Sequence, residues 1–327
     1  NPRPTSQSFV ITQQKQKDAL LYLLNFLKQN SYQFTVITPL SHERILKRKK
    51  VQSSEPKTLQ DIFGWNLPFS AKDLDQVLFP LLMQAELIQA ENDSFVSKIR
   101  VASLEDELFI HSAYPTVEND AVFFGPDTYR FYYHFKQYLN HHAQPLQRCV
   151  ELCCGSSAAA ISIAKSYSTV SEMYAVDINP KALFYSEINQ TFAGLENIYP
   201  IQSNLFSSLE GNFDLIFANP PYLMDSAERQ YRHGGNELDG TDLAFDILKQ
   251  GITHLSKNGS LFLYTGVAIR SSGNNFLVAV DAWIENYPSF KYTYEEIDPD
   301  VFGEELDEMA YQQIDRIAVA LVKITAI

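Results

Sequence analysis

The chain has 327 residues, of which 45% are hydrophobic and 20% charged, and its formal net charge is −13. This composition is typical of a folded globular protein, excludes disordered, collagen-like and coiled-coil chains, and at this length predicts two domains. No apolar run approaches the roughly 20 residues of a membrane-spanning helix, and the N-terminus lacks the basic and apolar segments of a signal peptide, so we expect a cytoplasmic protein without membrane contact.

The first predicted element is a helix over Lys15–Gln29, where leucines recur at helical spacing. Two more helices are expected at Thr58–Phe63 and Ala71–Ala85, with Ser70 as the N-cap of the latter. Between the first two helices lies a cluster of cations, which is interpreted either as a solvated surface or as a site for nucleic-acid phosphates. The cluster consists of Arg44, Lys47, Arg48, Lys49 and Lys50.

Short apolar runs separated by turn residues predict three strands after these helices. The runs are Leu87–Ile88, Phe95–Val101 and Leu108–His111, with a turn at Glu91-Asn92-Asp93. Two helices followed by a strand hairpin resemble a winged helix. We therefore expect residues 1–115 to form a smaller, mainly helical and winged-helix-like domain for substrate recognition, and residues 116–327 to form a second domain.

The second domain is predicted to begin with an aromatic-rich helix, after which strands and helices alternate. The helices are expected at Asp127–Asn140, Ala158–Ser168, Pro180–Ala193, Asp242–Leu255 and Asn275–Tyr287. The strands are expected at Cys149–Cys153, Glu172–Asp177, Ile198–Gln202, Phe213–Ala218, Ser260–Thr265, Lys291–Ile297 and Arg316–Ile324. Alternation of this kind predicts an α/β fold with a mostly parallel sheet.

The negative charge belongs to the second half of the chain. Residues 149–327 contain 10 Lys and Arg against 24 Asp and Glu, whereas residues 1–148 contain 16 against 15. An acidic protein is a poor match for a polyanion, but the cation cluster lies in the first half. The charge therefore favours a protein substrate without excluding a nucleic acid.

The cysteines Cys149, Cys153 and Cys154 all lie within six residues. A disulfide framework needs cysteines that are spread along the chain, so this pattern indicates a reducing, cytoplasmic setting. Neither a second cysteine pair nor a spaced histidine pair accompanies them, so we expect no metal site. We therefore interpret the three cysteines as small buried residues.

Two features predict a nucleotide-like ligand at the carboxyl ends of the strands. The segment from Glu151 to Ser157 is a turn of small residues between a strand and a helix, which brings backbone N–H groups close to a ligand. Asp177 ends the next strand, 26 residues after Glu151, where a carboxylate can accept hydrogen bonds from both hydroxyls of a ribose.

The third feature is Asn219-Pro220-Pro221-Tyr222, which follows the strand Phe213–Ala218 directly. Two consecutive prolines hold the backbone extended and remove two donors, so carbonyl oxygens stay free to accept hydrogen bonds. A planar NH₂ group fits this set: Asn219 and the Pro220 carbonyl accept its two hydrogens, and Tyr222 packs on its face.

With these motifs in this order, residues 122–327 resemble a class I S-adenosylmethionine-dependent methyltransferase of the NPPY type. Glu151 to Ser157 is similar to the family's E/D-x-G-x-G-x-G loop, with Cys153 and Ser157 where glycine is usual. The resemblance implies a Rossmann-like, mostly parallel sheet with an antiparallel last strand, and an enzyme that uses S-adenosylmethionine. It implies a cofactor site of Thr128, Glu151, Cys153, Gly155, Ser157, Asp177, Ile178, Asn204, Leu205 and Asn219, and a catalytic motif of Asn219, Pro220, Pro221 and Tyr222.

Within this group, the chain is most similar to HemK-type glutamine N-methyltransferases, which modify peptide-release factors. Gly125-Pro126-Asp127-Thr128 resembles their P-R-P-D/E-T-E segment without its Arg and last Glu, and residues 234–240 resemble their G-G-x-D-G loop with extra residues. The resemblance implies N-methylation of a glutamine in a protein substrate. A translation factor is one such substrate. The same motif also serves methylation of adenine N6, cytosine N4 and guanine N2 in DNA, rRNA or tRNA.

Two other classes are weighed against this interpretation. A methyltransferase-like module without activity would have no use for an intact NPPY motif. A nicotinamide dehydrogenase would have a fuller G-x-G-x-x-G turn and would give NPPY no role. Both are therefore less consistent with the residues than an N-methyltransferase.

Overall fold

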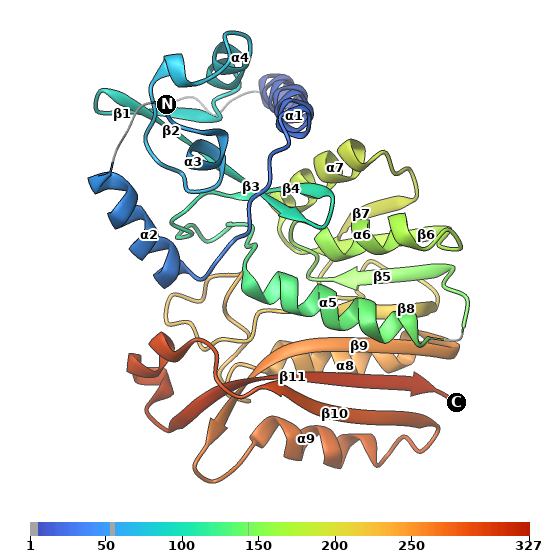
Figure 1. Ribbon diagram of the computed structural model, residues 1–327. Helices are drawn as coiled ribbons and strands as arrows, with labels where there is room; N and C mark the ends of the chain where they lie inside the picture. Colours follow the sequence, from blue (N-terminus) through green and yellow to red (C-terminus); the bar gives the residue numbers. More distant parts are fainter. Residues whose placement is uncertain (1–5, 53–55, 143) are drawn as a thin grey trace.

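A computed structural model describes residues 6–52, 56–142 and 144–327. Its centre is a seven-stranded sheet in the order β10-β11-β9-β8-β5-β6-β7 (Figure 1). Strands β5 to β9 run parallel to one another, and β11 lies antiparallel to both β9 and β10. The strands are β5 (Arg148–Leu152), β6 (Glu172–Asp177), β7 (Ile198–Gln202), β8 (Phe213–Ala218), β9 (Leu255–Arg270), β10 (Phe290–Asp298) and β11 (Ile314–Ala326). The predicted Rossmann-like sheet with an antiparallel last strand is confirmed.

Helices cover both faces of the sheet because side chains of each strand alternate between two buried clusters. In β8, Leu215 and Phe217 belong to one cluster, whereas Ile216 and Ala218 belong to the other. Helices α5 (Pro126–Asn140), α6 (Ala158–Ser166) and α7 (Pro180–Ala193) pack on the first face. Helices α8 (Asp242–Gly251) and α9 (Asn275–Ile284) pack on the second. Phe131, Tyr132 and Phe135 of α5 belong to the core, and the Phe135 ring lies 4.5 Å from that of Phe217.

The described residues of the N-terminal region form four α-helices and two hairpins. They are α1 (Ser6–Gln29), α2 (Pro39–Val51), α3 (Leu59–Phe63), α4 (Leu78–Gln84), β1 (Ile88–Glu91), β2 (Ser94–Ser97), β3 (Ile99–Leu104) and β4 (Glu107–Ser112). Strand β1 pairs with β2 and β3 pairs with β4. An isolated bridge joins Phe69 to Phe95, so a short helix, a bridge, a second helix and a hairpin follow one another as in a winged helix.

Two predicted helices in this region are wrong in extent. The first helix begins at Ser6 rather than at Lys15. Ala71–Ala85 is a 3₁₀ turn at Ala71–Asp73 followed by a separate helix α4. The break lies at Asp75, whose Oδ1 accepts hydrogen bonds from the N–H groups of Val77 (2.8 Å) and Leu78 (3.0 Å) and so begins a new helix. Helix α2, which carries the cation cluster, begins at Pro39 after the N-cap Thr38.

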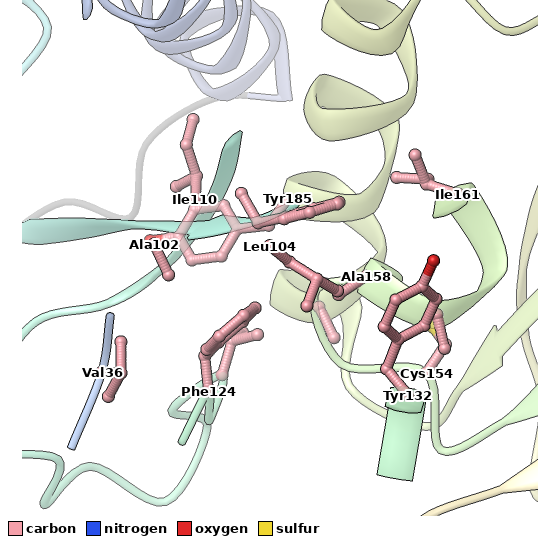
Figure 2. Close-up of a cluster of buried hydrophobic side chains, with 14 of the residues drawn as sticks. Val36, Ala102, Leu104, Ile110, Phe124, Tyr132, Cys154, Ala158, Ile161 and Tyr185 are labelled. Carbon is pink, nitrogen blue, oxygen red and sulfur yellow. The ribbon is translucent and has the colours of Figure 1, made fainter. Parts of the chain in front are cut away.

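The N-terminal region and the sheet share one continuous hydrophobic core. Figure 2 shows Ala102, Leu104 and Ile110 of the β3–β4 hairpin beside Tyr185 of α7, within one cluster of buried side chains. The first five residues of the predicted domain 1–115 lie outside the described residues. The described part of the chain contains no helix long and apolar enough to cross a membrane.

Asn189 of α7 is the polar link between the hairpin and the sheet. Its Oδ1 accepts from the Ile110 N–H (2.8 Å), and its Nδ2 donates to the carbonyls of Ile110 (3.2 Å) and Ser156 (3.0 Å). The side chain is fully buried, so all three bonds form away from water.

We expect Asn189→Ala to lower the free energy of unfolding by about 2–4 kcal/mol, because it leaves buried backbone groups without partners. Urea denaturation followed by circular dichroism measures this loss. Thr191→Ala, on the exposed face of the same helix, is the matched control and should change stability by less than about 0.5 kcal/mol. Equal stability of the two variants would contradict the assigned link.

Candidate active site

The turn after β5 has a left-handed backbone at every second residue. The φ angles are +53° at Cys153, +55° at Gly155 and +63° at Ser157. Residues other than glycine rarely adopt this conformation, at a cost of roughly 1–2 kcal/mol each. These are the three positions of the predicted E/D-x-G-x-G-x-G loop where glycine is usual, so Cys153 and Ser157 preserve the shape of the turn at the cost of strain.

Side chains from two neighbouring elements hold this turn. Asp177 at the end of β6 accepts from the N–H of Gly155 (3.0 Å) and the N–H of Asn179 (2.9 Å), one on each carboxylate oxygen. Ser157 donates to Ser186 of α7 (2.6 Å), and Ser186 donates to the Gly155 carbonyl (2.9 Å). Burial raises the pKa of Asp177, and the backbone donors act against that rise.

Glu151 acts on the helix that follows the turn. Its carboxyl is buried, and Oε1 accepts from the N–H of Ala160 in the first turn of α6 at 3.2 Å. Burial, followed by the nearby charge of Asp177, raises the pKa of Glu151 well above its usual range despite this bond. A neutral carboxyl still has lone pairs to accept with and gains one donor.

A cavity of about 510 Å³ lies at the carboxyl ends of β5, β6 and β8. This volume is in the range of small-molecule and cofactor sites. Of the predicted site residues, those that line it are Thr128, Glu151, Cys153, Gly155, Asp177, Ile178, Asn204, Leu205, Asn219, Pro220, Pro221 and Tyr222. Ser157 does not line it: its side chain is fully buried against α7, where it supports the turn.

The NPPY motif opens onto the same cavity from the end of β8. Within the described residues, no group donates a hydrogen bond to the Asn219 side chain or to the Pro220 carbonyl. Both oxygens are therefore free to accept from a ligand. That these acceptors bind a planar NH₂ group stays a prediction.

Tyr222 is fixed by a buried carboxylate that the sequence analysis did not assign. Its hydroxyl donates to Asp127 Oδ2, while the hydroxyl of Tyr264 in β9 donates to Oδ1 of the same carboxylate. Burial and the Asp127 charge raise the pKa of Tyr222 well above its usual range, so it stays a neutral donor. The ring packs against Gly266, where an added Cβ would lie 2.0 Å from it, and against the edge of Phe302.

The loop that resembles G-G-x-D-G lies directly behind the motif. Leu223 donates to the Arg232 carbonyl (2.9 Å) and accepts from the N–H of Gly234 (2.9 Å). A Cβ at Gly234 would lie 2.5 Å from the Pro221 oxygen, and one at Gly240 would lie 2.2 Å from the Tyr222 oxygen. Only glycine lets the loop approach this closely, so the loop supports the NPPY backbone.

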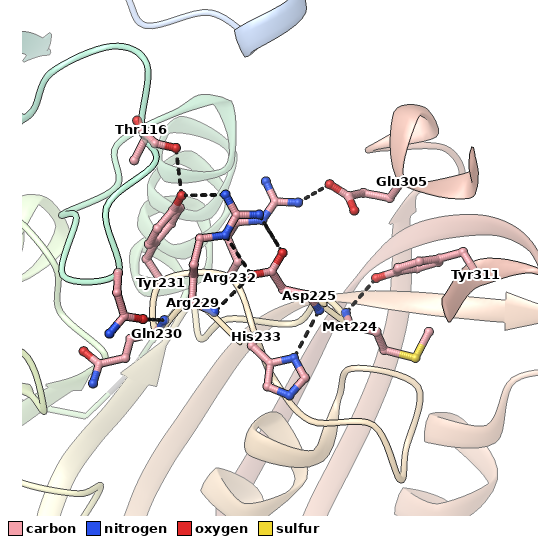
Figure 3. Close-up of polar contacts among 11 residues, drawn as sticks. Thr116, Met224, Asp225, Arg229, Gln230, Tyr231, Arg232, His233, Glu305 and Tyr311 are labelled. Atoms are coloured by element: carbon pink, nitrogen blue, oxygen red, sulfur yellow. Dashed lines mark hydrogen bonds and ion pairs between the residues drawn. The ribbon is translucent and has the colours of Figure 1, made fainter. Parts of the chain in front are cut away.

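The segment between the motif and that loop is tied by ion pairs and hydrogen bonds (Figure 3). Arg229 donates to both oxygens of Asp225, at 2.8 Å and 2.6 Å. Arg232 pairs with Glu305, and the Tyr231 hydroxyl donates to the Thr116 carbonyl (2.8 Å). These contacts bring residues from three parts of the chain to the rim of the cavity.

Residues of the N-terminal region also line the cavity. Val36, Ile37, His42, Arg100 and Tyr114 line it. The His42 ring stacks on Tyr114 with ring centres 4.0 Å apart. The expected role of the N-terminal region in substrate recognition stays a prediction.

Comparison with known proteins identifies the second half of the chain. Residues 136–274 match the family model of the methyltransferase small domain. The chain is 34% identical over 131 residues to the ribosomal protein uL3 glutamine methyltransferase of Neisseria gonorrhoeae, covering 37% of this chain and 44% of that protein. It is 33% identical over 150 residues to the protein of the same name from Xanthomonas campestris, covering 42% and 48%. The methyltransferase likeness therefore covers residues 136–274.

The chain spans about half the length of the curated relatives it matches. Among solved structures, Trm5b from Pyrococcus abyssi aligns with a TM-score of 0.48 and 14% identity, over 73% of this chain and 62% of that one.

Sequence reasoning on the methyltransferase domain missed residues whose partners are distant in the chain. Asp127 is 95 residues from Tyr222 and 137 residues from Tyr264. The only local signal was the acidic position in the segment Gly125-Pro126-Asp127-Thr128, which was matched to the family as a whole. Arg100 and His42 had no motif around them.

We expect Asp127→Ala to lower the free energy of unfolding by about 2–4 kcal/mol, because two buried tyrosine hydroxyls lose their acceptor. Urea denaturation measures this loss in the free energy of unfolding. Tyr264→Phe is the matched control: it removes one hydroxyl and leaves the Tyr222 bond in place, so its loss should be smaller. A larger loss for Tyr264→Phe would show that the carboxylate does not organise this cluster.

Proposed function

We propose that this protein is an S-adenosylmethionine-dependent methyltransferase that methylates the side-chain amide nitrogen of a protein glutamine. The observation that carries the proposal is the pair of free acceptors, Asn219 Oδ1 and the Pro220 carbonyl, in the cavity that Asp177 and the Gly155 turn also line. The methyltransferase family and the relatives named as uL3 glutamine methyltransferases support it.

The residues along the strand ends fit an adenosylmethionine. Gly155 presents open space, since an added Cβ would meet only the Phe123 oxygen at 3.8 Å. Each Asp177 oxygen uses one lone pair on a backbone N–H and keeps another for a ribose hydroxyl. Asn204 and the exposed Ile178 side chain line the same cavity, and we expect Asn204 to contact the adenine and Ile178 to cover it. When bound, S-adenosylmethionine supplies an electrophilic methyl group.

The chain's own contribution to the reaction is to orient the acceptor nitrogen. An amide nitrogen is a poor nucleophile because its lone pair is delocalised into the carbonyl. Asn219 Oδ1 and the Pro220 carbonyl accept its two hydrogens, which holds the NH₂ group in line with the methyl donor and favours a tetrahedral nitrogen. Tyr222, held by Asp127, packs on the amide face. Orientation of this kind can lower a barrier by several kcal/mol, up to roughly 7–11.

A nucleic-acid base is the second candidate substrate, and helix α2 is the observation in its favour. Arg44, Arg48 and Lys50 are exposed on this helix, whose first residue lines the cavity. Three features argue against it. Lys49 of the cluster pairs with Asp61 at 3.0 Å, and α4, which stands where a winged helix has its recognition helix, carries no Lys or Arg. The acidic Glu304 and Glu305 also line the cavity. We therefore place the protein substrate first.

The experiment that tests the proposal is transfer of a tritiated methyl group from adenosylmethionine to purified ribosomal protein uL3, a release factor, rRNA and tRNA in parallel. We expect label in one of the two proteins, lost on protease treatment and kept on nuclease treatment. Mass spectrometry should then find a mass gain of one methyl group on a glutamine. Label in RNA alone would overturn the glutamine assignment and support the second candidate.

We expect Asn219→Ala to reduce methyl transfer by at least about a hundredfold, because the amide hydrogen loses its acceptor in the transition state. Adenosylmethionine binding, measured by calorimetry, should remain within about threefold of the parent. Asn212→Ala, in the exposed turn before β8, is the matched control. Full activity of Asn219→Ala would remove this residue from the catalytic role.

We expect Asp177→Ala to weaken adenosylmethionine binding by about ten- to a hundredfold, because the ribose hydroxyls lose a charged acceptor. Calorimetry measures the affinity, and circular dichroism checks that the Gly155 turn still folds. Asp177→Asn keeps one acceptor oxygen and should bind with intermediate affinity. Unchanged affinity in both variants would place the cofactor elsewhere.

A further inference from the structure

Arg100 is a buried cation that lacks a counter-ion. Its side chain lies in β3, the residue is 4% exposed, and it lines the cavity from the N-terminal wall. Its Nε donates to the Gly64 carbonyl (3.0 Å), and Nη2 lies 3.4 Å from His42 Nδ1. No carboxylate oxygen of the described residues comes within 4.0 Å of the guanidinium.

The groups around Arg100 are neutral. His42 Nε2 is 3.0 Å from the Trp65 carbonyl, so a ring that donates there accepts from Arg100 at Nδ1. Burial, followed by the charge of Arg100, lowers the pKa of His42 to about 4 and keeps this ring uncharged at neutral pH. The pKa of the buried His111, the partner of Arg100 across the β3–β4 pair, is lowered well below its usual value. Tyr32, Tyr114 and Tyr129 complete the surroundings.

This arrangement sets Arg100 apart from the other arginines. Those that are partly buried each have a carboxylate oxygen within 4.0 Å: Arg130, Arg148, Arg229, Arg232, Arg270 and Arg316. Arg44 and Arg48 are exposed to water. Burying an unpaired charge costs several kcal/mol, so it is retained where a ligand supplies the opposite charge.

The guanidinium has donors left for such a ligand. Among the residues that the structure describes, no group accepts a hydrogen bond from its Nη1. A guanidinium donates to a carboxylate through two parallel N–H bonds, which gives both energy and a fixed orientation. Stacking of His42 on Tyr114, and the His42 contact to Nη2, hold the guanidinium in place for this.

We infer that Arg100 and His42 form a subsite that binds the carboxylate of an acidic residue close to the target glutamine in the protein substrate. The inference rests on the proposed function. Arg100 comes from β3 of the N-terminal region, whereas the Gly155 turn and Asp177 come from the strand ends of the central sheet, which favours the substrate over the amino-acid end of the cofactor. Glu304 and Glu305 line the same cavity and disfavour a polyanion such as RNA.

The test uses capped peptides with a central glutamine and four neutral neighbours, and four variants in which a single glutamate replaces each neighbour in turn. Methyl transfer and binding by NMR titration are both measured with the full-length protein. The parent protein should prefer one glutamate position over the neutral peptide by about ten- to a hundredfold in kcat/KM, because a charge-assisted pair is desolvated. Arg100→Gln should abolish this preference, and Arg100→Lys should retain part of it.

The control is Arg316→Gln, which removes a partly buried arginine that does not line the cavity and should keep the preference. Circular dichroism checks that the variants fold. If Arg100→Gln does not fold, the change in preference is measured with Arg100→Lys instead. Adenosylmethionine affinity should be the same in the parent and Arg100 variants. A matching loss of cofactor affinity would assign the subsite to the cofactor carboxylate and overturn the inference, as would a parent protein without positional preference.

Failure of the proposed function gives a different pattern. In one pattern, the parent protein methylates no peptide, but binding still favours one glutamate position and needs Arg100. This result would support the subsite and contradict the methylation of glutamine. If peptides are methylated with no dependence on a glutamate, the function stands and the subsite does not.

Discussion

The carboxylate of Asp127 is the contact on which the placement of the NPPY motif depends. It lies at the start of α5 and accepts hydrogen bonds from Tyr222 of the NPPY motif and Tyr264 of β9. Arg130, one turn further along α5, lies 3.8 Å from it. A buried carboxylate is tolerated only when its oxygens are paired, so α5, the motif and β9 must keep this relative placement. The motif is therefore held from its side-chain end by Asp127 and from its backbone by the loop that contains Gly234 and Gly240.

The cofactor turn shows a different balance, in which strain is accepted to preserve a shape. Cys153 and Ser157 adopt a backbone that costs roughly 1–2 kcal/mol each for a residue with a Cβ. Ser157 recovers part of this through its bond to Ser186, and Asp177 holds Gly155 between the two strained residues. The side chain that replaces glycine at position 157 is thus used inside the protein, which is why it does not face the cavity.

The strands and helices around the methyltransferase motif could be predicted because their signals are local. The ranges of β6, α7, β7 and β8 agree with the prediction residue for residue, since each combines a periodic apolar pattern with a clear start or stop. The break at Asp75 was missed because an apolar run conceals a new N-cap. The role of Asp127 was missed for another reason. Its contacts with Tyr222 and Tyr264 form only in the folded chain, and no short-range sequence pattern predicts them.

Net charge was the least informative of the sequence signals, and the structure shows why. The split between an acidic second half and a near-neutral first half sums exposed and buried groups alike. Exposed lysines and arginines on α2 are solvated and screened by salt, so they contribute little to the choice of a small ligand. Arg100 counts as one charge among 26 basic residues, yet it is buried, unpaired and faces the cavity. In a low-dielectric site, the electrostatic interaction of one such ion with a ligand is stronger than that of many exposed ions, because water does not screen it.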